Sequence, residues 1–402
     1  MNKKVAIVGG GASGLICAIF CAKNSCEVDI YEQNSKCGKK ILVSGNGRCN
    51  ITNKNLNTTD YFGENPSFCL DAINNFGYKE FSDFASSIGL LLDVKDDGRC
   101  YPLSNESKSV LSIFLSYATS LGVKIHLDKK ITDIKNLYKK HDFVVIATGS
   151  QAGEHLGGND DGYKFAKEFG HNIIDTYPSL VQLHLNSSIA SKMSGVKTFA
   201  KVTLLINNKK DISTSGDILF TSYGISGFAI LDISQKVSVA LMECNKVDIC
   251  INLLPSFNAQ KLSSHISKLM QKMPNLSIID ILVGLISLKI AKGILQSVNL
   301  SIDAKANDIN IKQCKKIANE LLNWRFEVSD THGFRHGEVS GGGVDTSEIN
   351  PKTMESLKKQ NLYFCGEVID ILGKRGGYNF AFAWASGYSC AKDINKNCKH
   401  KE

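Results

Sequence analysis

A short apolar run that ends in a glycine-rich turn constrains this fold most strongly. Residues Lys4–Val8 are predicted to form a buried strand. The turn that follows has the pattern G-x-G-x-x-G, in which the glycines are Gly9, Gly11 and Gly14. The first glycine permits a tight bend, the second lets a pyrophosphate approach the backbone, and the third lets a helix pack closely on the strand. We predict that helix over residues 12–24, with its positive amino end facing the anion. The pattern therefore predicts a dinucleotide-binding strand–turn–helix.

An acidic residue after the next predicted strand narrows the kind of dinucleotide. The strand is Glu27–Tyr31, and Glu32 follows it, eighteen positions after Gly14. A carboxylate at about this distance binds a ribose hydroxyl. An acid suits an unphosphorylated ribose, so FAD or NAD fits better than NADP. These residues alone do not choose between FAD and NAD.

The composition is that of a soluble globular protein with room for two or three domains. The chain has 402 residues, of which 43% are hydrophobic and 21% are charged. The net charge of +8 comes from lysine and arginine residues spread along the chain. We interpret it as a lysine-rich surface, with attraction of acidic ligands as the alternative. Because no compact basic stretch is interleaved with aromatic residues, we expect a small-molecule substrate and no nucleic-acid partner.

Targeting segments and metal-binding patterns are not evident. The chain enters its first strand at once, and its most apolar windows, residues 5–22 and 279–295, are explained by buried elements. We therefore expect a cytoplasmic protein without a membrane partner. The thirteen cysteines are scattered, as expected for reduced thiols, and the nine histidines never pair with cysteines or acids at ligand spacing. We therefore expect no metal.

A segment rich in glycine, asparagine, serine and lysine follows Glu32. It covers residues 36–53 and nearly lacks hydrophobic periodicity. Loops of this composition stay on the surface unless they bind something. Because the segment follows the ribose-binding acid directly, its backbone amides and Arg48 would suit phosphates or a ring edge. A solvated loop is the alternative.

The remainder of the first 150 residues is predicted to complete one nucleotide-binding half. Residues 66–121 are predicted to be mainly helical, with strands at 122–127 and around 130–134. The wholly apolar run Phe143–Ile146 fits an interior parallel strand. Ligands of such sheets lie outside the carboxyl ends of the strands, so Thr148–Gly149 would open a crevice beside the first turn.

The middle of the chain has a different pattern. Residues 181–252 contain short β-rich pieces such as 200–206 and 247–252. Turns are expected at Asn207–Asn208 and at Thr214–Asp217. The sequence therefore predicts a β-rich region here.

Several helices are predicted next, from Pro255 to about Trp324. We expect residues 181–325 to form an inserted β-plus-helical domain that caps the nucleotide half and selects the substrate. The nucleotide-binding domain would then consist of two parts, residues 1–180 and 326–402.

The C-terminal segment contains a second glycine-rich motif. A predicted strand at 362–365 is followed by Gly366 and Glu367. The diglycine Gly376–Gly377 then precedes a helix predicted over 380–394. The acid can bind the ribityl or pyrophosphate part of a flavin, and the helix amino end can stabilise negative charge on the reduced ring. A plain glycine-rich connection is the alternative, but together with the N-terminal turn the motif favours FAD.

Several short segments together resemble one bacterial flavoprotein family. They are Ser44–Asn50, Val339–Val344, Lys352–Ser356, Gly366–Glu367 and Gly376–Asn379. The family comprises proteins similar to aminoacetone oxidase and to NAD(P)/FAD-dependent oxidoreductases, and it includes the 3-dehydro-bile-acid delta-4,6-reductases. The resemblance runs from residue 3 to about residue 390.

This resemblance implies an α/β fold, in which a glutathione-reductase-like FAD-binding Rossmann domain carries an inserted β-barrel and helical domain. The chain departs from the family at two positions of the insert, where Ser222 replaces a usual histidine and Phe228 a usual proline. An activity that used this histidine would not carry over. The FAD contacts that the resemblance and the motifs imply are Gly9, Gly11, Ala12, Ser13, Gly14, Glu32, Gln33, Lys40, Ser44, Gly45, Asn46, Gly47, Arg48, Cys49, Asn50, Ile131, Ala147, Thr148, Gly149, Gly366, Glu367, Asp370, Gly376, Gly377, Tyr378 and Asn379.

The chemistry expected of such a site is flavin redox. No second G-x-G-x-x-G follows a strand, so NAD(P)H would dock transiently as the electron donor, or the substrate would reduce FAD directly. We favour an NAD(P)H-dependent reductase of an enone-like molecule, including bile-acid-like or steroid-like ones. The alternatives are an FAD oxidase of a small amine such as aminoacetone and a non-catalytic FAD-binding protein that senses redox state or binds a macromolecule. The candidates for catalytic residues are Arg48, Cys49, Tyr223, His332, Arg335 and His336.

Overall fold

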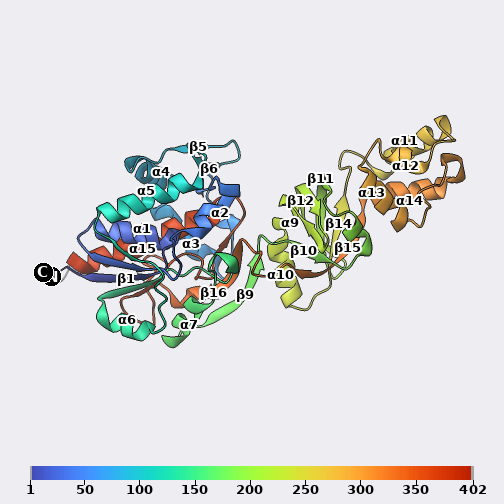
Figure 1. Ribbon diagram of the computed structural model, residues 1–402. Helices are drawn as coiled ribbons and strands as arrows, with labels where there is room; N and C mark the ends of the chain where they lie inside the picture. Colours follow the sequence, from blue (N-terminus) through green and yellow to red (C-terminus); the bar gives the residue numbers. More distant parts are fainter. Residues whose placement is uncertain (1, 400–402) are drawn as a thin grey trace. The chain divides into compact units, whose positions relative to one another are not determined.

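The computed structural model describes residues 2–399 and divides them into two compact units (Figure 1). Unit 1 contains the residues up to Tyr177 and those from Glu338 onward, and unit 2 contains Pro178–Gly337. Each unit encloses a hydrophobic core of its own.

A parallel five-stranded sheet forms the centre of unit 1. Its strand order is β17-β8-β1-β2-β7. The strands are β1 (Lys4–Val8), β2 (Glu27–Tyr31), β7 (Lys124–His126), β8 (Phe143–Ile146) and β17 (Leu362–Phe364). The interior position predicted for the apolar run 143–146 is confirmed, because β8 pairs with β1 on one side and β17 on the other. Its side chains are buried throughout, as expected of a strand covered on both faces.

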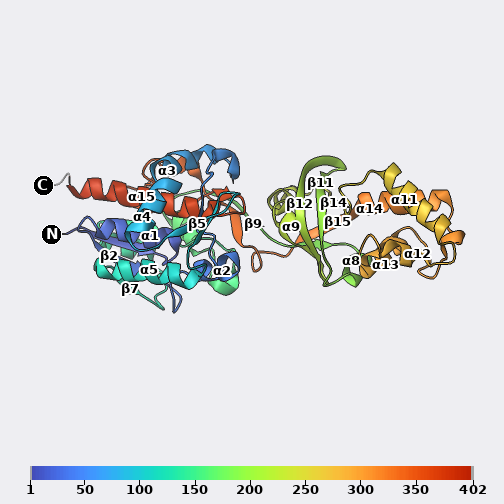
Figure 2. The ribbon, with the colours of Figure 1, turned by 90° about the horizontal axis from the view of Figure 1, so that it is seen from above.

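Helices cover both faces of this sheet. α1 (Ala12–Ala22), α5 (Ser107–Ser120) and α15 (Tyr378–Lys399) lie on one face, and α6 (Ile134–Lys140) lies on the other (Figures 1 and 2). α15 runs along α1, and a Cβ atom on Gly387 would lie only 2.4 Å from the Ser13 carbonyl oxygen. The first helix is therefore held, backbone against backbone, by the last one.

Smaller elements complete unit 1. β9 pairs with β16, β4 pairs with β18, and β3, β6 and β5 form a three-stranded sheet. Their bounds are β3 (Thr52–Asn53), β4 (Tyr61–Phe62), β5 (Leu92–Val94), β6 (Arg99–Pro102), β9 (Ile173–Ser179), β16 (Val339–Val344) and β18 (Leu372–Gly373), with helices α2 (Lys39–Gly47), α3 (Cys69–Asn75), α4 (Tyr78–Ser87) and α7 (Asp161–Glu168). Short 3-10 helices lie at Thr58–Asp60 (η1), Pro66–Phe68 (η2), Glu154–Leu156 (η3), Ala306–Asp308 (η4, in unit 2) and Thr346–Glu348 (η5).

Two local expectations for unit 1 are wrong. Segment 36–53 is not a loop throughout, because α2 begins at Lys39 and buries Ile41, which is 1% exposed. Residues 130–134 form no strand. Instead, the Asp133 side chain caps α6 by accepting a hydrogen bond from Asn136 N at 2.8 Å.

A closed antiparallel barrel makes up the first part of unit 2. Its strand order is β10-β13-β12-β11-β14-β15. The strands are β10 (Leu183–Leu185), β11 (Lys197–Ile206), β12 (Lys209–Phe220), β13 (Gly224–Ser226), β14 (Val247–Asn252) and β15 (Trp324–Thr331). Because β15 closes the barrel between β14 and β10, unit 2 extends to Gly337, beyond the expected limit at residue 325.

The long hairpin of β11 and β12 confirms one predicted turn and overturns another. Asn207 and Asn208 connect the strands with φ values of 50° and 66°, as a two-residue hairpin turn with positive φ requires. Residues Thr214–Asp217 are not a turn, because they lie within β12. There Thr214 pairs with Val202 of β11.

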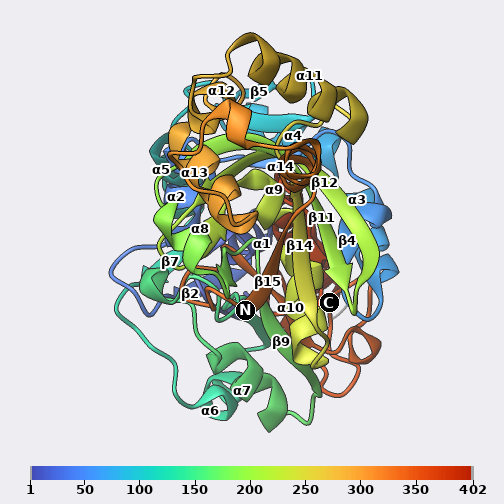
Figure 3. The ribbon, with the colours of Figure 1, turned by 90° about the vertical axis from the view of Figure 1, so that its right-hand side faces the viewer.

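Helices fill the remainder of unit 2. The predicted helical region between Pro255 and Trp324 is confirmed, since α11 to α14 lie there and pack on one another, α11 most extensively on α14 (Figure 3). The helices are α8 (Ser188–Lys192), α9 (Phe228–Leu231), α10 (Ser234–Met242), α11 (Ala259–Lys272), α12 (Ile278–Leu282), α13 (Leu288–Ser297) and α14 (Ile311–Leu322). The predicted α/β class, with a Rossmann-type sheet, an inserted barrel and helices, is thus confirmed. Within residues 2–399, no helix combines the length and apolar character that crossing a bilayer requires.

Candidate functional site

Both ends of the chain meet at the carboxyl edge of the parallel sheet. Gly9 N donates to Tyr31 O at 2.9 Å, and Ala147 N donates to Val8 O at 2.9 Å. Just past β17, Cys365 N donates to the last residue of β8 at 3.1 Å. The segments that follow these four strands therefore leave the sheet side by side. Such an edge is where open α/β sheets bind ligands.

The three glycines of the first turn have three different surroundings. Gly9 has a φ of 111°, and a Cβ atom there would lie 2.3 Å from Ala147 O. A Cβ atom on Gly14 would lie 2.0 Å from Gly9 O, whereas one on Gly11 would meet nothing within 4 Å. The first and third glycines therefore pack against the protein, while the second faces open space that a ligand can enter.

The start of α1 has the geometry of an anion-binding site. Gly11 is its N-cap residue, and no side chain caps the helix, so its first backbone N–H groups remain available to a ligand. Ser13 is fixed from the other end of the chain, because its hydroxyl donates to Cys365 O at 3.3 Å. A Cβ atom on Gly366 would lie 2.5 Å from the same hydroxyl oxygen. This open, uncapped turn fits the pyrophosphate of FAD.

The Glu32 carboxylate is buried and held in one orientation. It is 7% exposed; its Oε2 accepts from Gly10 N at 2.9 Å, and its Oε1 accepts from Asn34 N at 2.8 Å and Asn34 Nδ2 at 2.7 Å. A carboxylate can accept about four hydrogen bonds. One further acceptor position is therefore left for a ribose hydroxyl.

Two other predicted contacts lie near Glu32. Gln33 Nε2 donates to Gly157 O at 2.7 Å, which ties the end of β2 to the segment after β8. Ile131 lies in the connection between β7 and α6, which is fastened beside Glu32 by the bond from Lys129 N to Glu32 O at 2.8 Å. A contact of Gln33 or Ile131 with FAD stays a prediction.

The end of α2 bends at Ser44–Asn46, where the backbone leaves helical geometry. The Arg48 guanidinium lies over the Tyr101 ring, 5.2 Å from its centroid, and its Nε donates to Gly45 O at 3.3 Å. Gly47, like Gly11, would place a Cβ atom in open space. This bend therefore presents backbone and an exposed cation, as the phosphate or ring-edge hypothesis requires.

Cys49 follows this bend and is fully buried, with a φ of 60°. Burial raises the pKa of its thiol to about 11. The thiol is therefore protonated near neutral pH, which argues against a role as nucleophile.

Glu367 joins three elements around the site. Its Oε2 accepts from Lys40 Nζ at 2.7 Å, and its Oε1 accepts from Ser150 Oγ at 2.7 Å and from Ser340 N at 2.8 Å. These donors come from α2, the segment after β8, and β16. The sequence pattern indicated Lys40 and Glu367 but not Ser150 or Ser340, although each serine lies beside a glycine-rich motif.

Asp370 faces the protein interior. It is 2% exposed, and its Oδ2 accepts from Glu64 N at 2.8 Å. Burial raises the pKa of its carboxyl group. Its visible role is to anchor the Gly63–Glu64 turn, and a contact with FAD stays a prediction.

The diglycine holds the start of α15 against the segment after α2. Asn53 Nδ2 donates to Gly376 O at 2.9 Å, and a Cβ atom on Gly377 would lie 2.3 Å from Thr52 O. Asn379 fixes the preceding bend, because its side chain donates to and accepts from the backbone of Gly373, both at 2.8 Å. The amino end of this 22-residue helix is thereby placed beside the α2 segment.

Three contacts therefore join the segment after α2 to α15 and the turn before it. Trp384 Nε1 donates to Ile51 O at 2.8 Å, in addition to the contacts of Asn53 and Thr52. Ala147, Thr148 and Gly149 follow β8 at the same edge, and the amide of Asn50 lies between Gly377 N and the carbonyl groups of Thr52 and Cys100. The remaining predicted contacts of this group, at the sheet edge, the α2 bend and the start of α15, are Ala12, Ser13, Ser44, Asn46 and Tyr378.

A cluster of aromatic and imidazole rings lies in unit 2. His332 stacks on Tyr223 at a centroid distance of 4.0 Å, and its ring lies 4.1 Å from that of His336. His184 Nε2 lies 2.6 Å from His332 Nδ1. Burial, with help from the neighbouring histidines, lowers the pKa of His332.

Three of the predicted catalytic candidates thus come together, while Arg335 is exposed and Ser222 lies beside Tyr223. The sequence pattern missed His184, whose signal is its place between two buried leucines of β10. Among residues 2–399, no group of three or more histidine, cysteine or acidic side chains is arranged to hold a metal ion.

The chain is similar to known proteins along nearly its whole length. The HI0933-like protein Rossmann domain family matches residues 3–393. The chain is 32% identical over 401 residues to the 3-dehydro-bile acid delta(4,6)-reductase of Clostridium scindens, covering 96% of this chain and 98% of the relative. It is 31% identical over 412 residues to a ribosomal RNA dihydrouridine synthase of Haemophilus influenzae, covering 97% of this chain and 98% of that relative. The Escherichia coli protein of the same name is 29% identical over 399 residues, which cover 96% and 97% of the two chains.

Proposed function

Because the chain belongs to the HI0933-like Rossmann family and is an FAD-dependent oxidoreductase, we propose that it uses NAD(P)H to reduce a carbon–carbon double bond conjugated with a carbonyl group. Steroid-like or bile-acid-like enones are the favoured substrates. The observation that carries this proposal is the similarity to the bile-acid reductase along nearly the whole of both chains.

The names of the two kinds of relatives share one chemistry. A 3-dehydro bile acid with a delta-4 double bond is an enone, because that double bond is conjugated with the 3-oxo group. Dihydrouridine is uridine reduced at the ring double bond that is conjugated with a carbonyl group. Both names therefore describe addition of two electrons and two protons to a carbonyl-activated double bond.

The overall reaction balances with a nicotinamide donor. NAD(P)H gives up one hydride, which becomes the new C–H bond at the carbon β to the carbonyl, and a proton from the medium adds at the α carbon. FAD, when bound, relays the electron pair between the two substrates.

The residues of this chain hold the cofactor in a defined orientation. The uncapped start of α1 and the space at Gly11 would bind the pyrophosphate, and the Glu32 carboxylate would bind the ribose. Glu367, fixed by Lys40, Ser150 and Ser340, and the start of α15 would hold the flavin half. The positive end of that helix would favour the reduced, negatively charged ring.

The charge distribution of unit 2 favours an alternative substrate, a uracil base within RNA. The helical segment 255–324 has nine lysines against four acids. Binding of a small uncharged steroid would not require this excess of positive charge, whereas a polyanion such as RNA would bind to it electrostatically.

The decisive experiment is anaerobic mixing of the FAD-loaded protein with NADH or NADPH while the flavin absorbance is followed. We expect bleaching by one of them, then recovery of the absorbance when a 3-oxo-delta-4 steroid is added, with the reduced steroid as product. Bleaching only by aminoacetone, with peroxide formed in air, would establish the oxidase instead. If neither donor bleaches the flavin, the protein is not an NAD(P)H-dependent reductase.

A further inference from the structure

The helical segment of unit 2, residues 255–324, carries most of the excess positive charge. Its nine lysines and four acids give a net charge of +5, out of +8 for the whole chain. All nine lysines are exposed. Two of the acids, Asp280 and Asp308, accept hydrogen bonds at the starts of α12 and η4. The positive excess therefore faces the solvent.

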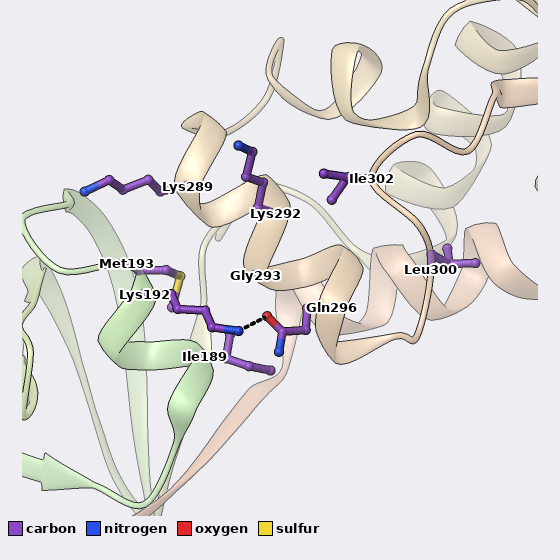
Figure 4. A pocket seen from close by; sticks show the side chains of 9 residues that line it. All are labelled: Ile189, Lys192, Met193, Lys289, Lys292, Gly293, Gln296, Leu300 and Ile302. Atoms are coloured by element: carbon purple, nitrogen blue, oxygen red, sulfur yellow. Dashed lines mark hydrogen bonds between the residues drawn. The ribbon is translucent and has the colours of Figure 1, made fainter.

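Part of this charge surrounds a hollow between α8 and α13, with a volume of about 380 Å³ (Figure 4). Lys192, Lys289 and Lys292 contribute three ammonium groups, while Ile189 and Met193 are among the apolar side chains that line it. Figure 4 shows Lys192 reaching across to α13, where its Nζ donates to the amide oxygen of Gln296 at 3.2 Å. The lining of the hollow is thus both basic and apolar.

A second basic hollow, of about 420 Å³, lies between the end of α13 and α14. Lys312, Lys315 and Lys316 line it. The two hollows adjoin, because Gln296 and Leu300 line the first while residues 297–299 line the second. We call the six lysines of the two hollows the lysine surface.

The lysine surface has few acidic neighbours within residues 2–399. Among residues 2–399, none of its six ammonium groups forms an ion pair. That of Lys289 donates to a backbone carbonyl, Ser194 O, at 2.8 Å. Glu320 is the single acid that lines either hollow, and burial raises the pKa of its carboxyl group. Six like charges with a single acid beside them repel one another, and an anionic partner would relieve that repulsion.

We propose that the lysine surface binds the phosphate backbone of RNA. Six cations across two adjoining hollows exceed what one phosphate or carboxylate group can neutralise, and concave hollows suit a strand better than a flat bilayer. RNA is chosen over DNA because uracil, a base of RNA, is the carbonyl-activated ring that comes attached to phosphates. To that extent the inference rests on the proposed function.

This surface would bind without reading sequence. Lysine is a point charge that contacts phosphate, and neither hollow is lined by an aromatic side chain on which a base could stack. The expectation of no nucleic-acid partner depended on a compact basic stretch. Here five of the lysines are spread over α13 and α14, and Lys192 joins them from α8, which lies about 100 residues earlier in the sequence.

The test is fluorescence anisotropy of the FAD-loaded full chain with a labelled, uridine-containing single-stranded RNA of about 16 nucleotides. If all six lysines contact phosphates, log K against log salt should have a slope of about −4. The variant Lys289→Gln/Lys292→Gln/Lys315→Gln/Lys316→Gln should reduce the magnitude of that slope by about 3 and weaken binding at least about tenfold. The matched control is Lys79→Gln/Lys108→Gln/Lys135→Gln/Lys139→Gln, which removes four exposed lysines of unit 1 and should bind RNA as the unmodified chain does.

Several outcomes would overturn the inference: no binding at low salt, equal losses in the two variants, tighter binding of DNA of the same sequence, or tighter binding of vesicles of anionic lipid. Its failure is distinct from failure of the proposed function. If NAD(P)H bleaches the flavin and a steroid enone restores it while RNA does not bind, the reductase stands and the lysine surface has no RNA partner. If RNA binds as predicted but no enone is reduced, the lysine surface binds RNA and the proposed reductase activity fails.

Discussion

The site at the sheet edge and the lysine surface are both suited to phosphate, but they are built in opposite ways. At the sheet edge, backbone N–H groups and a missing side chain at Gly11 form the cradle, and the nearby carboxylates of Glu32 and Glu367 are each held by three donors. On the lysine surface, side-chain ammonium groups carry the charge, and within the described residues none of the six has a carboxylate partner in an ion pair. Phosphate binding by backbone N–H groups depends on the shape of the turn, so one added methyl group can abolish it. Phosphate binding by ammonium groups depends on the total charge, so each lysine that is removed should lower the affinity by a part.

The largest effect is expected from Gly14→Ala, which tests the shape of the cradle from inside the protein. Alanine normally stabilises a helix relative to glycine by about 0.5–1 kcal/mol. Here its Cβ would lie 2.0 Å from Gly9 O, and overpacking of this kind costs about 1–3 kcal/mol or more. We expect a melting temperature lower by about 5–10 °C and little bound FAD, as measured by thermal unfolding and by flavin absorbance of the purified protein. A stable variant with full flavin content would show that the turn does not pack as described.

Gly11→Ala tests the same cradle from the ligand side. Its φ is −83°, which alanine adopts freely, and the new Cβ would meet nothing in the protein within 4 Å. We expect unfolding within about 1 kcal/mol of the unmodified chain but FAD affinity lower by about 10–100-fold, because the pyrophosphate would lose hydrogen bonds to the backbone. Titration of the apoprotein with FAD measures this.

Gly284→Ala is the matched control, since its Cβ would make an ordinary contact 3.5 Å from Ile281 O in unit 2. It should bind FAD normally. Equal affinities for Gly11→Ala and the control would place the pyrophosphate elsewhere.

The smallest expected effect is on the free energy of unfolding, and it distinguishes lysines that pair with a carboxylate from lysines that do not. Lys40→Met removes one of three donors to Glu367, whose side chain is 17% exposed, and should destabilise the protein by about 1 kcal/mol after solvent screening. Lys292→Met removes an ammonium group without an acid partner, so its effect should stay within about 0.5 kcal/mol and be neutral or stabilising. Denaturant unfolding of both variants provides the comparison. A larger loss for Lys292→Met would mean that its charge is compensated within the protein.

Features that depend on short-range pattern could be predicted from the sequence. The strand at Lys4–Val8, the turn glycines and the apolar strand β8 follow from local periodicity and from the steric needs of the turn. Asn207–Asn208 was predictable for the same reason, because asparagine tolerates the positive φ values of a hairpin turn.

Features that depend on tertiary contacts could not be predicted in this way. α2 forms in a glycine-rich segment because Ile41 is buried against the rest of unit 1, and β12 continues through Thr214–Asp217 because β11 pairs with it. His184 joins His332 only when β10 pairs with β15. The lysine surface likewise exists only after α8, α13 and α14 have packed together.

The fastening of α1 to α15 has a consequence for the order in which the nascent chain folds. The sheet of unit 1 lacks its edge strand β17, and α1 lacks the helix packed at Ser13, until the ribosome has made the last tenth of the protein. At about 5–20 residues per second, the roughly 200 residues between β8 and β17 take about 10–40 s to synthesise. Unit 2 is one continuous segment, Pro178–Gly337, and its barrel can close during that interval. We therefore expect unit 2 to fold before unit 1 is complete, while the edge of β8 that later pairs with β17 is still unpaired.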